Sequence, residues 1–329
     1  MDSRAVRGWF FVAMLVVLSA TAGPAWASFP GGNGTIVYGW TSANKYVGSP
    51  TSIRTVNPRS GEVRALRDCP LRTVEPPLAY PDCQVSAPRY SPDGVRIAFP
   101  TVQFAYPPAE AWQSRPSLAT MASDGTDLEE PTGAYPYQRL AWSPAGDRFL
   151  IQRQLGPGGT TGEFAIFLAS LDGTELSQVT PEATQAPDWS STGQIAVSRF
   201  RDPCPPGCGD IYLTRLDRGL RRLTYRGGYS PSWSPHGTKL AFVRGPIGGQ
   251  ADVYLIGRNG RGLRRLTRRG GHSPAWSPDG KWIAFIREGD IYVTRTTGRG
   301  RRRLVDELGP DEEFGLGPQV TSVDWQPLP

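Results

Sequence analysis

Few residues of this chain could take part in acid–base or nucleophilic chemistry. The histidines are His236 and His272. His236 occupies the place that Asp93 and Asp279 hold in other copies of a repeated phrase, and His272 stands where Tyr229 stands one repeat earlier. The chain contains no Gly-x-Ser-x-Gly elbow, phosphate-binding loop or dinucleotide fingerprint. We therefore predict no catalytic residue, no enzyme activity and no cofactor.

The cysteines form two local pairs, Cys69 with Cys83 and Cys204 with Cys208. An oxidising compartment would favour disulfides between such near neighbours. A zinc site built from all the cysteines is the competing interpretation, and these spacings do not support it. We expect two disulfides that stabilise long loops, and no metal site.

Residues 1–27 have the features of a signal peptide. A basic start precedes an apolar stretch from Trp9 to about Ala22, and Ala25 and Ala27 supply small residues at the cleavage positions. We expect residues 28–329 to be exported to the periplasm, the cell envelope or the extracellular space, with no transmembrane segment after cleavage. An uncleaved N-terminal anchor is the alternative. The formal net charge of +6 is modest for this length and does not indicate a nucleic-acid partner.

A short phrase of the type Ser-Pro-x-Gly recurs along the chain and sets its organisation. The copies begin at Ser91, Ser143, Ser190, Ser234 and Ser277, and each follows an aromatic residue, namely Tyr90, Trp142, Trp189, Trp233 or Trp276. Pro in the second place and Gly in the fourth are typical of a type I turn. The aromatic residue is expected to fill the space between neighbouring repeats.

One complete repeat, from Ser273 to Leu304, reads as four short strands. The strand after the turn is almost continuously apolar, which indicates burial on both faces. Four antiparallel strands make one blade of a β-propeller, and the repeat length suits such blades. A partial unit at Asn33–Tyr38 lacks the aromatic first strand, which Trp325 near the C-terminus supplies. We predict an all-β, six-bladed β-propeller, closed by pairing of the strand around Trp325 with the N-terminal blade.

The Trp-Ser-Pro-Asp-Gly units, with their Ile-Ala-Phe second strands and Asp-Ile-Tyr third strands, resemble the TolB-type, WD-like propeller repeats of exported bacterial proteins. The resemblance runs from about Phe29 to Pro329 and is weaker in the first two blades, where Tyr90 replaces Trp. It implies a signal peptide at 1–27 and a TolB-like propeller at 28–329. TolB itself carries a further N-terminal domain for which this chain leaves no room, so the translocation role of TolB is not transferred.

Long connections are expected between second and third strands, at about 39–51, 100–116, 152–163, 199–209 and 245–251. They all open on one face of such a ring. Variable loops on a rigid scaffold commonly carry binding sites. The repeat does not account for five aromatic residues in these loops: Trp40, Tyr46, Phe104, Tyr106 and Trp112. They are candidate anchors for a partner, or they hold the loops down.

Asp210, Asp252 and Asp290 recur at the start of third strands. As a group of carboxylates near one channel mouth they could attract a cation or a basic group. The interpretation we favour is that each accepts backbone hydrogen bonds at a turn. A cation at the mouth is otherwise unsupported, because no glycine-rich calcium loop follows any of them.

Arginine clusters lie on the third turns and fourth strands of three consecutive blades: 218–222, 261–269 and 299–303. They could form a basic stripe for an acidic polymer. We favour the alternative that they protect the outer strands from unwanted pairing.

Together these features predict an exported, monomeric, non-catalytic propeller that binds an unknown protein or cell-envelope polymer through its long-loop face. The alternative is an envelope hydrolase or lyase with its active site at the mouth of the channel on that face, where Glu110, Glu163 and Asp202 supply carboxylates.

Overall fold

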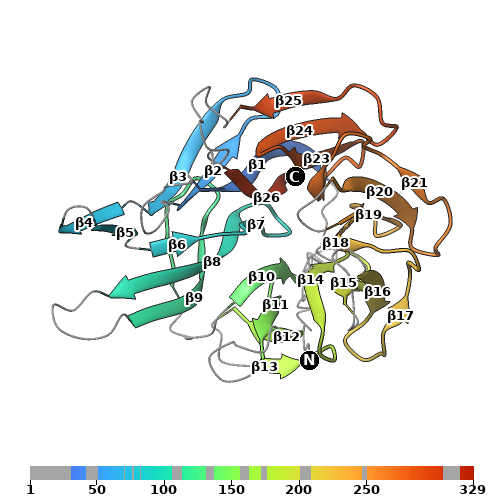
Figure 1. Ribbon diagram of the computed structural model, residues 1–329, viewed down its shortest axis with the longest axis horizontal. Coiled ribbons are helices and arrows are strands. Elements are labelled where there is room, and N and C mark those ends of the chain that lie inside the picture. Colours follow the sequence, from blue (N-terminus) through green and yellow to red (C-terminus); the bar gives the residue numbers. More distant parts are fainter. Residues whose placement is uncertain are drawn as a thin grey trace, which may run out of the picture.

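The computed structural model describes residues 31–41, 51–69, 71–75, 78–81, 83–105, 113–130, 137–155, 163–171, 176–200, 209–246, 250–306 and 319–329. Every regular element in these ranges is a β-strand, and the strands form six blades around a common axis (Figure 1). None of the described residues belongs to a helix able to cross a membrane. The predicted all-β propeller is confirmed, and the predicted signal peptide lies outside the described residues.

The blades follow one another along the chain. Blade 1 contains β26 (Gln319–Leu328), β1 (Gly32–Thr41), β2 (Thr51–Val56) and β3 (Val63–Cys69); blade 2 contains β6 (Cys83–Val85), β7 (Arg89–Tyr90), β8 (Arg96–Ala105) and β9 (Gln113–Ala122). Blade 3 contains β10 (Tyr137–Trp142), β11 (Arg148–Gln154), β12 (Phe164–Ser170) and β13 (Leu176–Gln178); blade 4 contains β14 (Thr184–Trp189), β15 (Ile195–Arg199), β16 (Asp210–Thr214) and β17 (Arg221–Arg222). Blade 5 contains β18 (Tyr229–Trp233), β19 (Lys239–Arg244), β20 (Asp252–Gly257) and β21 (Arg264–Arg265); blade 6 contains β22 (His272–Trp276), β23 (Trp282–Arg287), β24 (Asp290–Arg295) and β25 (Arg302–Val305).

The strand nearest the axis in each blade is called here the inner strand: β26, β7, β10, β14, β18 and β22 (Figure 1). Because the strands are antiparallel, the Ser-Pro-x-Gly turns after the inner strands all lie at one end of the ring, the turn face. The connections between second and third strands, and those between blades, lie at the opposite end, the loop face.

The repeated phrase folds as its composition predicts. In each copy the glycine N–H donates to the carbonyl oxygen of the serine, at 2.8–3.0 Å. The serine side chain adds a second bond, as when Ser91 Oγ accepts the backbone N–H of Arg96 at 2.9 Å. Gly94 has φ +72°, and a Cβ there would lie 2.0 Å from the carbonyl oxygen of Pro327. Glycine is therefore required at this position by both backbone conformation and space.

The aromatic residue before each turn packs between blades. Trp233 is 1% exposed and shares a cluster with Ala196 and Ile211 of blade 4 and with Leu240 and Phe242 of its own blade. Burial of such a side chain contributes about 2–3 kcal/mol to folding. The predicted role of the aromatic residues as packing wedges is confirmed for this blade.

The C-terminal strand completes the first blade. β26 pairs antiparallel with β1, with Trp325 opposite Ile36 and Val323 opposite Tyr38. The Trp325 indole N–H donates to the Gly34 carbonyl at 3.1 Å, and the ring packs with Ile286 of blade 6. Both ends of the described chain thus contribute to one sheet, the arrangement expected for ring closure.

Blade 2 departs most from the repeat. Its first strand is split into β6 and β7, which both pair with β8, and Ala87 between them has φ +43°. The loop expected at 100–116 is shorter than predicted, because β8 and β9 continue pairing until Ala105 lies opposite Gln113. The β-branched and aromatic residues of this segment favour an extended ladder.

Before blade 2, β4 (Leu71–Glu75) and β5 (Leu78–Pro81) form a hairpin that projects from the ring (Figure 1).

Candidate functional site

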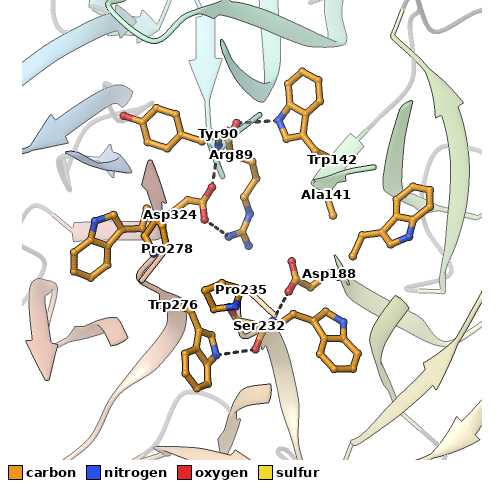
Figure 2. A pocket seen from close by; sticks show the side chains of 13 residues that line it. Arg89, Tyr90, Ala141, Trp142, Asp188, Ser232, Pro235, Trp276, Pro278 and Asp324 are labelled. Carbon is orange, nitrogen blue, oxygen red and sulfur yellow. Dashed lines mark hydrogen bonds and ion pairs between the residues drawn. The ribbon is translucent and has the colours of Figure 1, made fainter. Parts of the chain in front are cut away.

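The inner strands place equivalent residues around the axis in rings. The ring directly before the aromatic residue consists of Arg89, Ala141, Asp188, Ser232, Ala275 and Asp324. All of these except Ala275 line a cavity of about 50 Å³ toward the turn face, together with Pro235 and Pro278 of the repeated phrase (Figure 2). Four of the blades contribute a charged or hydroxyl side chain to this ring.

Arg89 and Asp324 form an ion pair in this cavity. Arg89 Nη1 lies 3.6 Å from Asp324 Oδ1, and Asp324 Oδ2 accepts the backbone N–H of Tyr90 at 2.9 Å (Figure 2). Burial raises the pKa of Asp324, and the Arg89 charge and the Tyr90 N–H oppose that rise. The pair also links blade 1 to blade 2 at the centre of the ring.

Asp188 carries a second carboxyl group of the axis whose pKa is strongly raised. Its Oδ2 accepts the backbone N–H of Trp233 at 2.5 Å, which joins blade 4 to blade 5 (Figure 2). Removal from water raises the pKa of Asp188 to about 7, although the nearby Arg89 charge and this hydrogen bond lower it. Asp188 therefore changes charge close to neutral pH.

A larger cavity of about 710 Å³ opens toward the loop face, a volume typical of ligand sites. Its lining comes from blades 3, 5 and 6: Arg139, Tyr229, Ser230, Gln250, Ala251, Arg269, Gly270, Gly271, His272, Ser273, Arg287 and Glu288. A small cavity of about 20 Å³ lies between the other two, because it shares Arg89 with the turn-face cavity and Arg139 with the loop-face cavity. The three cavities therefore follow one another along the axis.

Two polar pairs are formed within the loop-face cavity. Arg287 Nη2 lies 2.9 Å from Glu288 Oε1, and Glu288 occupies a left-handed turn position with φ +51°. His272 Nδ1 lies 3.2 Å from Ser273 Oγ. Removal from water lowers the pKa of His272, and the charge of Arg139 lowers it further, so the ring is neutral at pH 7. The cavity thus contains one internally neutralised pair and one neutral imidazole.

The predicted aromatic anchors are only partly placed. Trp40 lies on β1, half-buried against the core between blades 6 and 1, with the Arg54 guanidinium 3.8 Å from its ring centroid. Phe104 belongs to β8, opposite Ser114. Tyr46, Tyr106 and Trp112 lie outside the described residues. A binding role for these five residues stays a prediction.

The three repeated aspartates are each held by the fourth strand of their own blade. Asp252 pairs with Arg265 and accepts hydrogen bonds from Thr267 Oγ1 at 2.9 Å and from the Gly270 N–H at 3.1 Å. Asp210 repeats this arrangement with Arg222, Thr224 and Gly227, and Asp290 pairs with Arg303 at 2.7 Å. Their buried positions suit the turn interpretation, and a ligand role for them stays a prediction.

The arginines of the outer strands have a further contact that the sequence did not suggest. Arg221 Nη2 donates to the backbone carbonyl of Arg258 in the next blade at 3.0 Å. Arg264 bonds in the same way to the Thr296 carbonyl, and Arg302 to the Pro58 carbonyl. The fourth strands of blades 4, 5 and 6 are therefore each hydrogen-bonded to the end of the third strand of the following blade.

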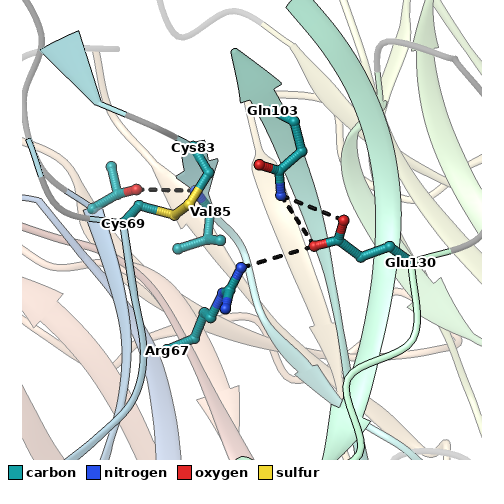
Figure 3. The surroundings of a disulfide bond; sticks show 7 residues. Arg67, Cys69, Cys83, Val85, Gln103 and Glu130 are labelled. Carbon is teal, nitrogen blue, oxygen red and sulfur yellow. Dashed lines mark hydrogen bonds and ion pairs between the residues drawn. A yellow bond between two sulfur atoms is a disulfide. The ribbon is translucent and has the colours of Figure 1, made fainter. Parts of the chain in front are cut away.

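Cys69 and Cys83 form the predicted disulfide, which joins the end of β3 to the start of β6 across the projecting hairpin (Figure 3). Nearby, Val85 N–H donates to Thr51 Oγ1 at 2.9 Å, and Glu130 accepts from Gln103 at 3.1 Å.

Cys204 and Cys208 lie outside the described residues, as do Glu110 and Asp202. Among the described residues no cluster of three or more potential metal ligands occurs.

Sequence reasoning missed the charged residues of the axis, namely Arg89, Arg139, Asp188 and Asp324. The signal that could have found them is their place in the repeat. Two positions of each inner strand face the axis: the residue directly before the aromatic residue and the residue three places before it. A charged residue at either position differs from the small residues that other blades carry there.

A curated relative that matches this chain is the Protein TolB homolog of Chlorobium luteolum, with 31% identity over 143 residues. The match covers 40% of this chain, and the chain spans 29% of the length of that relative. A scan against family models found no match.

Solved TolB structures have the same fold. TolB from Acinetobacter baumannii matches with a TM-score of 0.64 and 19% identity over 89% of this chain and 67% of that one. The putative TolB from Agrobacterium tumefaciens matches with a TM-score of 0.58 and 19% identity, over 90% of this chain and 100% of that one.

Propellers of peptidases are also similar. The puromycin-hydrolyzing peptidase of Mycobacterium tuberculosis matches with a TM-score of 0.54 and 18% identity over 84% of this chain and 54% of that one. At this identity the likeness concerns the fold. With its repeated phrases, its six four-stranded blades and its likeness to these TolB proteins, the chain is a TolB-like β-propeller.

Proposed function

We propose that this chain is a non-catalytic binding propeller that holds a partner protein or cell-envelope polymer at the loop-face mouth of its axis. The observation that carries the proposal is the loop-face cavity of about 710 Å³. Concave sites of this size with a few convergent polar groups are the usual places for ligands. The likeness to TolB propellers supports a scaffold without chemistry of its own.

The walls of this cavity are built partly from strands and a hydrogen-bonded connection, which favours binding. Tyr229 and His272 begin inner strands, and Gly271 N–H donates to the Ala251 carbonyl at 2.9 Å, which fixes the connection between blades 5 and 6. A preformed wall reduces the entropy that a partner must lose on binding. The long loops of the same face would add contact area around this mouth.

We also propose that the protein acts in an exported, oxidising compartment as a monomer. The Cys69–Cys83 disulfide supports this placement, because such bonds persist mainly outside the cytosol. The predicted signal peptide is consistent with it. An exported location also argues against nucleic acid as the partner.

A matched pair of charge reversals tests the binding face. Arg269 lines the loop-face cavity and is exposed, whereas Arg218 is exposed in the turn between β16 and β17 at the opposite face. Residues 28–329 are immobilised and exposed to envelope extract as wild type, Arg269→Glu or Arg218→Glu. We expect Arg269→Glu to reduce capture of the specific partner about tenfold, as for a loss of ~1.4 kcal/mol. Equal capture by the two variants would refute the assignment of this face.

The second candidate function is an envelope hydrolase or lyase at the same mouth. His272, neutral at pH 7, and Glu288 line one cavity, and peptidase propellers share the fold. A neutral imidazole could serve as a general base. Purified protein is assayed on peptide, ester and cell-wall glycan substrates beside His272→Ala. Turnover by wild type that His272→Ala abolishes would establish the enzyme; absence of turnover in both supports the scaffold.

A further inference from the structure

We propose that Arg139 forms a carboxylate-binding site at the inner end of the loop-face cavity. This proposal rests on the proposed function and makes it more specific, because it identifies the chemical group of the partner that binds at the axis. The ligand would be an acidic side chain or the terminal carboxylate of a protein partner.

Arg139 breaks the pattern of its ring. Three places before the aromatic residue, the other five blades carry Ala87, Ala186, Ser230, Ser273 and Ser322. Four of these small residues have φ between +43° and +50° within a bulged part of the inner strand. Bulges of this kind redirect side chains near functional sites. The small residues leave the space at the axis into which the one long side chain of the ring can extend.

Arg139 also differs from the other arginines of the axis in lacking a protein partner. Arg89 pairs with Asp324, and Arg287 pairs with Glu288. Within the ranges that the structure describes, the side chain of Arg139 makes neither a hydrogen bond nor an ion pair. Removal from water lowers the pKa of Arg139 to about 10, and the Arg89 charge contributes, so the guanidinium stays charged at pH 7. The half-buried Arg139 side chain therefore presents an unpaired charge to the two cavities that it lines, and a bound anion would supply its partner.

The groups around Arg139 are suited to an anion. Arg139 lines both the loop-face cavity and the small axial cavity, as do Ser230 and Ser273. Tyr229 and His272 also line the loop-face cavity and offer further donors. The one carboxylate in that lining, Glu288, is already engaged by Arg287. An incoming anion therefore meets donors and a free positive charge.

The charge balance favours a carboxylate over a phosphate group. At the inner end of the cavity Arg139 contributes one uncompensated positive charge, because Arg269 is exposed at the rim and the neutral His272 adds no charge. A carboxylate carries one negative charge and matches the planar fork of a guanidinium. A phosphate monoester carries between one and two charges and would leave part of its charge unpaired at this depth. Arg269, exposed at the rim, can steer an acidic segment toward the mouth.

The test uses acetate as the probe and needs no knowledge of the natural partner. The melting temperature of residues 28–329 is measured at pH 7 in sodium chloride, sodium acetate and sodium phosphate of matched ionic strength. For a Kd near 10 mM, about 100 mM acetate should raise the melting temperature by about 2 °C. Arg139→Gln should abolish the difference between acetate and chloride. Arg218→Gln, which removes one exposed charge at the turn face, should retain it.

Stability supplies a second readout. Because Arg139 has no partner among the described residues, Arg139→Gln and Arg139→Met in chloride should melt within about 1 °C of wild type or above it. A fall of more than about 5 °C in both variants would make Arg139 a structural residue and overturn the proposal. An acetate effect unchanged in Arg139→Gln, or a larger effect of phosphate than of acetate, would also overturn it. Loss of the acetate effect with unchanged partner capture would retain the site and refute its use by the partner.

With the site established, two capped amino acids identify the form of the carboxylate. Acetyl-aspartate amide presents a side-chain carboxylate, and acetyl-glycine presents a terminal one. The compound that gives the larger shift in wild type, and none in Arg139→Gln, identifies the group that the axis prefers.

Discussion

Replacement of Asp188 by Asn should make folding less dependent on pH. Asp188 lines the axial cavity, where its Oδ2 accepts the Trp233 N–H. The amide oxygen of Asn can accept the same bond without carrying a charge. The variant therefore keeps the geometry and removes only the cost of holding a carboxylate away from water.

The sign follows from the raised pKa. Between the unfolded pKa of 3.8 and the folded value of about 7, the folded protein binds the proton and the unfolded chain releases it. The stability contributed by this proton is complete below pH 3.8 and declines as the pH rises to about 7. The full shift corresponds to about 4 kcal/mol. Because the side chain is half-buried and faces the channel, we expect about half of that, with ~1.5 kcal/mol lost between pH 5 and pH 8.

The assay is the melting temperature of wild type and Asp188→Asn at pH 5 and pH 8. We expect the advantage of the variant to grow by about 3 °C between these values. Asp217→Asn, a matched change at an exposed turn residue, is the control. A difference between Asp188→Asn and wild type that does not change with pH would refute the assignment of a raised pKa to Asp188.

Three further changes test the scaffold. Asp252→Ala leaves Arg265 and two other donors without their acceptor, so urea unfolding should report a loss of about 3 kcal/mol; a loss below 1 kcal/mol would contradict a structural role for this carboxylate. Replacement of Cys69 and Cys83 by Ser opens a cross-link between residues 14 apart and should cost about 3 kcal/mol; wild type unfolded under reducing conditions should match this variant. Trp325→Ala removes a side chain that is 4% exposed between the first and last blades, with an expected loss of about 3–5 kcal/mol; an unchanged urea midpoint would show that β26 is dispensable for closure.

The fold was predictable because its main features are local and repeated. A turn needs its glycine within four residues, and the wedge aromatic stands directly before it, as at Trp276 and Gly280. The extension of β8 and β9 was not predictable in the same way, because their ladder pairs residues such as Phe104 and Ser114 on either side of a loop outside the described ranges.

The chemistry of the axis was harder to predict for a physical reason. Arg89, Asp188 and Asp324 come from three blades and are separated by about a hundred residues or more along the chain. Their contacts arise only when the ring closes and the inner strands converge. A single strand gives no sign of this. A comparison of equivalent places across the repeats would have identified Arg139 as the exception in its ring.

These axial charges oppose the stability that the rest of the fold supplies. Burial raises the pKa of Asp188 and lowers that of Arg139, and both directions mean that the charged form is disfavoured inside the ring. Alanine or serine at the same places, as other blades have, would fold without this penalty. Perturbed groups of this kind concentrate at functional sites. The charged axis, rather than the repeated turns, is therefore the part of the molecule whose composition calls for a ligand.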